Sequence, residues 1–211
     1  MNQKFHSNRK KTFPIPYLKA SIGYFGLAQR TEKEFFSSWV PNMIRKGSST
    51  NSLAEFADYF KQQLNTHVLK SYLRKNPSGF HLCGFGTDGI PEFYFIRNIQ
   101  SMNGPFYEGF SGRYTTTEDF RARDALKFGG SLTNLKNQVF YYVNGDLRNF
   151  HQFWTGATAF VDALKSDSSF WGISTPGERA KWKLEAFASF YERHSKNQII
   201  GRPIDVLELT A

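Results

Sequence analysis

The stretch that decides the fold is residues 80–96, which read FHLCGFGTDGIPEFYFI. Phe80–Phe85 and Pro91–Ile96 are compact apolar runs typical of buried strands. Between them, Gly86–Gly89 has turn chemistry, and Asp88-Gly89 is its strongest element because glycine adopts a positive φ without steric cost. The sequence therefore predicts a β-hairpin here.

One strand is expected upstream of this hairpin. The run Lys19–Phe25 is compact and apolar, and Gly26 closes it. Pro14 and Pro16 exclude a regular central strand before it, because proline cannot donate to a sheet ladder.

Two helices should follow that strand. Thr31 with Glu34 matches a capping box, and an apolar face at helical spacing runs to Ile44, with Pro41 expected to kink or split the helix. Ser52 with Glu55 is a second capping box. It precedes an apolar stripe that could continue towards Leu73, made of Leu53, Phe56, Ala57, Phe60 and Leu64.

The chain beyond the hairpin has weaker signals. Loops are expected at Gly104-Pro105 and Ser111-Gly112, a short helix over Glu118–Phe128, and a strand over Val139–Val143. Apolar residues then recur at helical spacing from Leu147 to Leu164.

A further helix and a last strand are expected near the C-terminal end. Thr175, Pro176 and Glu178 mark the helix start as N-cap, first helical position and capping-box glutamate. Ile204–Leu209 is the predicted closing strand.

The order of these elements favours a layered α+β fold. Helices come in pairs between blocks of strands, whereas a doubly wound parallel sheet requires simple alternation. No repeat or long linker appears, so we predict one domain over residues 11–211 after a basic, flexible segment over residues 1–10.

Composition fits a globular protein, with 40% hydrophobic and 21% charged residues. No apolar run approaches the roughly 20 residues of a membrane span, and the N-terminus has no signal-peptide pattern, so a cytoplasmic location without membrane contact is expected. The formal charge of +9 is spread along the chain, with one cluster at Arg9–Lys11. This favours a solvated basic surface over a nucleic-acid site.

Other chemistry has little support in the sequence. Cys83 is the only cysteine, so no disulfide or Cys-rich zinc site is expected, and it is interpreted as a small buried hydrophobe. The five histidines lack metal-ligand spacing, and His81 is interpreted as a satisfied strand residue. Glu118, Asp119 and Asp124 are interpreted as a charged face. No cofactor or metal is expected.

The ordered pattern resembles proteasome β-type subunits, which are N-terminal-nucleophile (Ntn) hydrolases. The matching segments are Lys11–Ile15 with the strand ending Tyr24–Ala28, the hairpin Leu82–Tyr94, and Ile200–Val206 before the closing strand. The resemblance implies a four-layer αββα sandwich. It also implies amide hydrolysis by an N-terminal Thr, Ser or Cys whose α-amine acts as base.

By this resemblance, Lys11 occupies the active-site lysine position and Gly26 the oxyanion glycine position. The nucleophile has no counterpart, because only ten residues precede Lys11 and neither Ser7 nor Thr12 opens a strand. The family's acidic residue falls at Asn197, which carries no charge, and Asn144-Gly145 stands near its Ser-Gly pair.

Three functions stay open at this point. The chain could belong to a peptidase or amidase whose nucleophile lies upstream, acting on a peptide or amide substrate. It could be a non-catalytic structural or assembly subunit of a homo-oligomer, since a sheet lacking its first hairpin would need a partner at its edge. It could instead be a basic nucleic-acid-binding module.

Overall fold

The computed structural model describes residues 10–103, 106–121, 150–165 and 175–194. The chain divides into two compact units. The first contains Lys11–Asn103, Tyr107–Val143 and Leu209–Ala211, and the second contains Met1–Lys10, Gly104–Phe106 and Asn144–Glu208. A single domain over residues 11–211 and a flexible segment over residues 1–10 both stay predictions, and residues 1–9 lie outside the described part.

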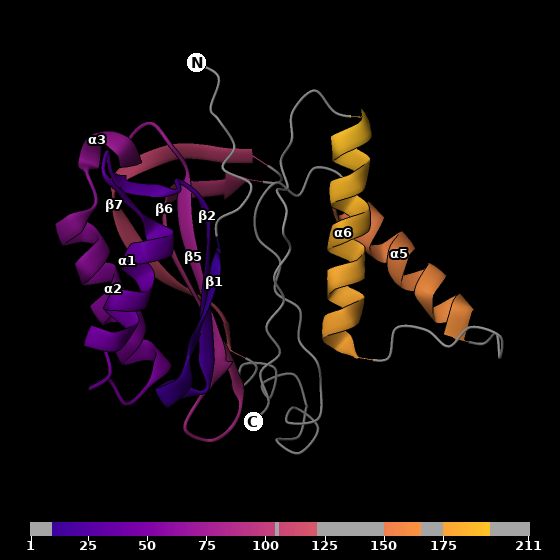
Figure 1. Ribbon diagram of the computed structural model, residues 1–211, viewed down its shortest axis with the longest axis horizontal. Coiled ribbons are helices and arrows are strands. Elements are labelled where there is room, and N and C mark those ends of the chain that lie inside the picture. Colours follow the sequence, from indigo (N-terminus) through magenta and orange to yellow (C-terminus); the bar gives the residue numbers. More distant parts are fainter. Residues whose placement is uncertain (1–9, 104–105, 122–149, 166–174, 195–211) are drawn as a thin grey trace. The chain divides into compact units, whose positions relative to one another are not determined.

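The first unit is an α+β structure with a five-stranded sheet in the order β1-β2-β5-β6-β7. Pairing is antiparallel between β1 and β2, β2 and β5, and β5 and β6, so a doubly wound parallel sheet is excluded. Helices α1 and α2 cover one face of this sheet (Figure 1). The elements are β1 (Thr12–Ile15), β2 (Ala20–Gly26), β3 (Gln29–Thr31), β4 (Glu34–Phe35), α1 (Phe36–Lys46), α2 (Leu53–His67), α3 (Lys70–Leu73), β5 (Ser78–Phe85), β6 (Pro91–Asn103) and β7 (Phe106–Arg121).

The predicted hairpin is confirmed as β5 and β6. Phe85 pairs with Pro91 at the turn end of the ladder. The Gly86 N–H donates to the Ile90 carbonyl at 2.8 Å, and Gly89 has a φ of 74°. Glycine at this position closes the turn without strain, as the Asp-Gly signal requires.

The second capping box is confirmed, and it starts α2. Ser52 Oγ accepts the Glu55 N–H at 3.2 Å, and Glu55 Oε2 accepts the Asn51 N–H at 2.8 Å. The whole predicted stripe is buried. The helix ends at His67 instead of reaching Leu73, and the separate single turn α3 follows.

The prediction that Thr31 and Glu34 form a capping box at a helix start is wrong. Thr31 and Glu34 lie in the small β3–β4 pair, and α1 begins only at Phe36 without a side-chain cap. The Glu34 carboxylate is held by Arg30 instead of by a helix terminus. Pro41 does not split α1, which is continuous to Lys46. The buried apolar face holds this helix on the sheet despite the hydrogen bond that proline removes.

The loop at Ser111-Gly112 and the helix start at Glu118 are also wrong, because β7 runs through both as one strand. Gly112 has a packing role there. A Cβ at Gly112 would lie 3.1 Å from Arg74 Nε, so the missing side chain makes room for the arginine. Glycine in a sequence often indicates a loop, whereas Gly112 marks a close approach of a side chain to the strand. Residues 122–128 lie outside the described part.

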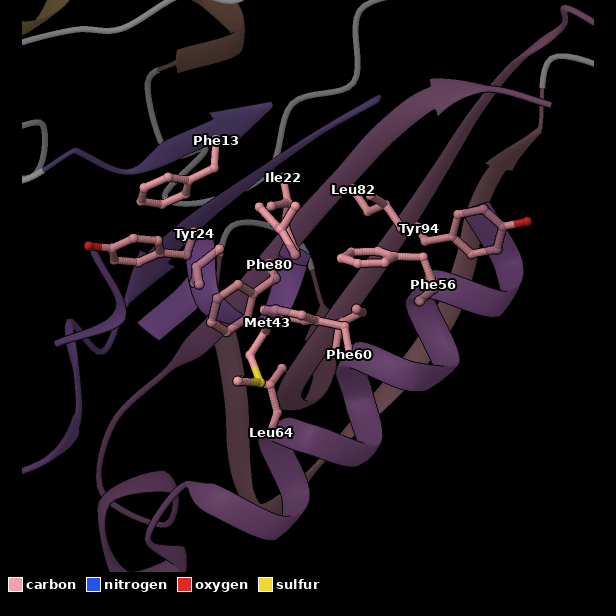
Figure 2. Packing of buried hydrophobic residues seen from close by; sticks show 14 of the residues in the cluster. Phe13, Ile22, Tyr24, Met43, Phe56, Phe60, Leu64, Phe80, Leu82 and Tyr94 are labelled. Carbon is pink, nitrogen blue, oxygen red and sulfur yellow. The ribbon is translucent and has the colours of Figure 1, made fainter. Parts of the chain in front are cut away.

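The core of the first unit lies between the sheet and its helices. Figure 2 shows Phe80 from the sheet packed with Phe60 of α2 and with Tyr24 of β2. Phe80 and Phe60 are fully buried, and their ring centroids lie 5.2 Å apart in an edge-to-face arrangement. This geometry is the one that aromatic quadrupoles favour.

The second unit contributes α5 (Phe150–Lys165) and α6 (Pro176–His194), which contact each other. The predicted helix start at Thr175 is confirmed, because its Oγ1 accepts the Glu178 N–H at 3.1 Å while Glu178 Oε2 accepts the Thr175 N–H at 3.1 Å. The predicted strands Val139–Val143 and Ile204–Leu209 and the loop at Gly104-Pro105 lie outside the described residues.

Candidate functional site

The two candidate residues from the resemblance, Lys11 and Gly26, lie at the same end of the β1–β2 pair. Thr12 is opposite Gly23, and the Tyr24 N–H donates to the Lys11 carbonyl at 3.1 Å. Gly26 follows two residues later and pairs with Ser78 of β5. The antiparallel pairing of β1 with β2 therefore places the two predicted positions near each other.

The Lys11 ammonium and the Leu27 N–H are the chemical groups at this end of the β1–β2 pair. Partial burial lowers the pKa of the Lys11 ammonium, although much of the residue's surface is exposed. The N–H that follows Gly26, on Leu27, donates to the Pro77 carbonyl at 2.9 Å. An oxyanion needs a free donor, and this N–H is already engaged. Ser7, Asn144-Gly145 and Asn197 lie outside the described residues.

Gly26→Ala should destabilise the first unit, because both the backbone conformation and the close packing at Gly26 require glycine. Its φ is 76°, and an added Cβ would lie 2.0 Å from the Pro77 carbonyl oxygen. We expect a loss of about 2–3 kcal/mol in the free energy of unfolding, measured by urea denaturation. Gly23→Ala is the matched control, because a Cβ there meets its nearest neighbour at 3.6 Å. Equal losses in both variants would contradict this role for Gly26.

The sheet face opposite the helices carries its own side-chain cluster, which we call the second face. The ladder places Ser21 beside Cys83 and Cys83 beside Phe93, and in the next row His81 beside Phe95. Phe95 is 1% exposed, yet it lies outside the core that α1 and α2 cover. Both faces of this sheet therefore bury apolar side chains.

Within the second face, His81 lies between two aromatic rings. Its ring stacks on Phe95 with centroids 4.8 Å apart and lies 5.7 Å from Phe25. Gly79 leaves room for both phenylalanines, since a Cβ there would come within 2.6 Å of each ring. Burial lowers the pKa of His81 from 6.5 to about 4. A histidine held neutral among aromatic rings packs like an aromatic residue, which agrees with its interpretation as a strand residue.

His81 should make the first unit less stable in mild acid. Between pH 6.5 and about 4 the unfolded chain protonates this histidine and the folded chain does not, so stability falls as the pH falls through this window. The full loss is at most about 3 kcal/mol. The free energy of unfolding, measured by urea denaturation across this range, should depend less on pH in His81→Leu than in the wild type. The exposed His67→Leu is the control, and parallel curves for wild type and His81→Leu would contradict the assignment.

Cys83 is half-buried on the second face, where its surroundings disfavour the thiolate. Its Sγ lies 3.0 Å from Ser21 Oγ, and burial raises the pKa of the thiol. Nucleophilic cysteines have the opposite shift, because the thiolate is the reactive form.

A buried polar network on the helix-covered face was missed by sequence reasoning. Ser78 Oγ lies 2.7 Å from Tyr114 Oη, and Asn98 Oδ1 accepts the Ser78 N–H at 2.8 Å. Asn65 Oδ1 accepts the Tyr114 N–H at 2.7 Å, and its Nδ2 donates to the Tyr114 carbonyl at 3.0 Å. Burial raises the pKa of Tyr114, so it stays neutral. The inward position of Asn98, two residues after Ile96, was the signal that could have found this network.

Comparison with protein-family models, with curated proteins and with solved structures finds no match for the chain. Within the described ranges, no group of three or more His, Cys, Asp or Glu side chains is placed to hold a metal ion. No helix in that same part of the chain is long and apolar enough to cross a membrane.

Proposed function

We propose that this chain is a proteasome-subunit-like structural protein, a non-catalytic assembly subunit with the αββα sandwich of the Ntn-hydrolase lineage. The observation that carries the proposal is the sheet that buries apolar side chains on both faces. Phe80 is fully buried beneath the helices, and Phe95 is 1% exposed on the second face.

A two-faced sheet favours a multilayer architecture. An antiparallel sheet with only one covered face alternates apolar and polar side chains along each strand. In β6, by contrast, the neighbours Tyr94, Phe95 and Ile96 are all buried. A sheet of this kind packs helices on one face and a further layer on the other, as in a sandwich.

The state of the candidate chemical groups supports a structural role over hydrolysis. The Leu27 N–H is bonded to Pro77, the Cys83 thiol has a raised pKa, and the hydroxyl of Ser21 lies beside that thiol. None of these groups is prepared to attack a carbonyl or to stabilise an oxyanion.

Thiol labelling tests the layered architecture, because Cys83 is the only cysteine and lies on the second face. We expect Cys83 to react slowly with a disulfide reagent in the native protein and quickly in denaturant. The reference is Ser48→Cys in a Cys83→Ala background, which places one thiol at an exposed position. Labelling of native Cys83 as fast as this reference would show an open second face and overturn the sandwich.

A hydrolysis assay tests the non-catalytic part of the proposal. A panel of fluorogenic peptide amides should show no turnover above buffer, and Lys11→Ala should behave like the wild type. Turnover that disappears in Lys11→Ala would instead assign the chain to the hydrolases. Light scattering tests the assembly role, for which we expect a homo-oligomer, and a clean monomer would contradict it.

A further inference from the structure

We propose that the surface formed by Leu69, Lys70, Arg74 and Lys75, here called the α3 surface, binds an acidic segment of a partner protein that also carries apolar side chains. This inference stands apart from the proposed fold relationship, since any α+β domain with this surface would recognise the same chemistry.

The α3 surface carries three exposed cations close together in the sequence. Lys70, Arg74 and Lys75 are all exposed. The printed sequence has no aspartate or glutamate between Asp58 and Asp88. In the part of the chain that the structure describes, the ion pairs seen at exposed cations of the first unit join Arg30 with Glu34 and Lys61 with Asp58, away from the α3 surface. Three exposed cations on a short stretch create a local positive potential that attracts carboxylates.

The backbone beneath these cations is held in place. The Arg74 N–H donates to the Lys70 carbonyl at 3.1 Å, which sets the two cations one turn apart. Leu73 is 1% exposed, and its carbonyl accepts from Asn98 Nδ2 at 2.7 Å. A surface that is already ordered loses little conformational entropy when a partner binds.

The Arg74 side chain lies beside the strand β7. Its Nε is 3.1 Å from the place where a Cβ of Gly112 would be. Figure 1 shows α3 at one end of the helical layer, close to β7. Arg113 follows Gly112 and is exposed, and strand alternation directs its side chain to the opposite face. Arg113 adds long-range attraction without joining the α3 surface.

Leu69 determines the kind of partner. It is 43% exposed, among few large apolar side chains that the described residues leave in solvent, and it adjoins the cations directly. A phosphate backbone would contact the cations but gain nothing from the exposed leucine. An acidic peptide with apolar side chains can contact both the cations and Leu69. Charged contacts then steer the encounter, and apolar contact adds residence time.

The test uses the full chain and a fluorescein-labelled peptide of alternating glutamate and leucine as probe, with anisotropy at low salt as readout. The patch variant Lys70→Gln/Arg74→Gln/Lys75→Gln is compared with Lys33→Gln/Arg45→Gln/Lys46→Gln, whose three cations are also exposed. Each triple variant lowers the formal charge of +9 by three. Circular dichroism verifies that both stay folded.

We expect the patch variant to weaken peptide binding about tenfold and the control variant less than about twofold. Leu69→Ser should weaken binding of this probe but not of an all-glutamate peptide. Equal losses in both triple variants, or no binding by the wild type, would overturn the proposal. Tighter binding of a single-stranded oligonucleotide than of the peptide, with the same dependence on the patch, would overturn it in favour of nucleic acid.

Discussion

Phe80→Ala should cost the first unit about 3–5 kcal/mol of its free energy of unfolding. Phe80 is fully buried at the centre of the core in Figure 2. Its ring centroid lies 5.0 Å from that of Phe36 in α1, 5.2 Å from that of Phe60 in α2 and 5.9 Å from that of Tyr114 in β7. Removing it leaves a cavity where two helices and the sheet meet.

The measurement is urea denaturation monitored by circular dichroism. Phe80→Leu should lose much less, since leucine retains most of the buried volume. Phe160→Ala is the surface control, because Phe160 is 55% exposed. A loss in Phe80→Ala no larger than that in Phe160→Ala would mean that this core does not stabilise the fold.

Asn98→Leu should be destabilising by a similar amount, about 3–5 kcal/mol, for a different reason. Asn98 is 1% exposed, and its Oδ1 accepts the buried Ser78 N–H. Its Nδ2 donates to the carbonyls of Leu73 and Asn76 at 2.7 and 2.9 Å. Leucine has a similar volume but can make none of these three hydrogen bonds, and losing the partner of a buried polar group costs about 1–3 kcal/mol.

Urea denaturation reports the total effect, and hydrogen exchange of the Ser78 amide reports its location. The matched control is Asn42→Leu, because Asn42 makes its hydrogen bonds on the exposed side of α1 and should change stability by less than about 0.5 kcal/mol. An unchanged exchange rate at Ser78 in Asn98→Leu would contradict the role of the amide.

Local chemistry predicted several elements correctly. The hairpin β5–β6 follows from the Asp88-Gly89 turn between apolar runs, and α2 and α6 follow from their capping boxes at Ser52 and Thr175. Each signal depends on neighbours within four residues, so no tertiary information was needed.

The wrong predictions share a cause. The capping-box residues Thr31 and Glu34 pair with each other across two short strands, and Arg30 engages the carboxylate of Glu34. The sequence places Gly112 in a loop, whereas in the structure its missing side chain leaves room for the side chain of Arg74. In both cases a residue's partner decided its role, and the pattern of single residues does not reveal partners.

The candidate site was only partly accessible from sequence. The resemblance selected Lys11 and Gly26, and the β1–β2 pairing places them at one end of a ladder. The engagement of the Leu27 N–H by Pro77 involves residues 50 positions apart. A contact of that span is invisible to motif reasoning.

By itself, the sequence determined the α+β class, the hairpin, two helix starts and the buried stripe of α2, because turn geometry, capping and periodicity are local. Only the tertiary structure decided that the sheet buries both faces, that His81 stacks on Phe95, and that Asn98 bonds three distant backbone groups. These features depend on which strands become neighbours, and that choice reflects the summed packing of the whole unit more than any one segment.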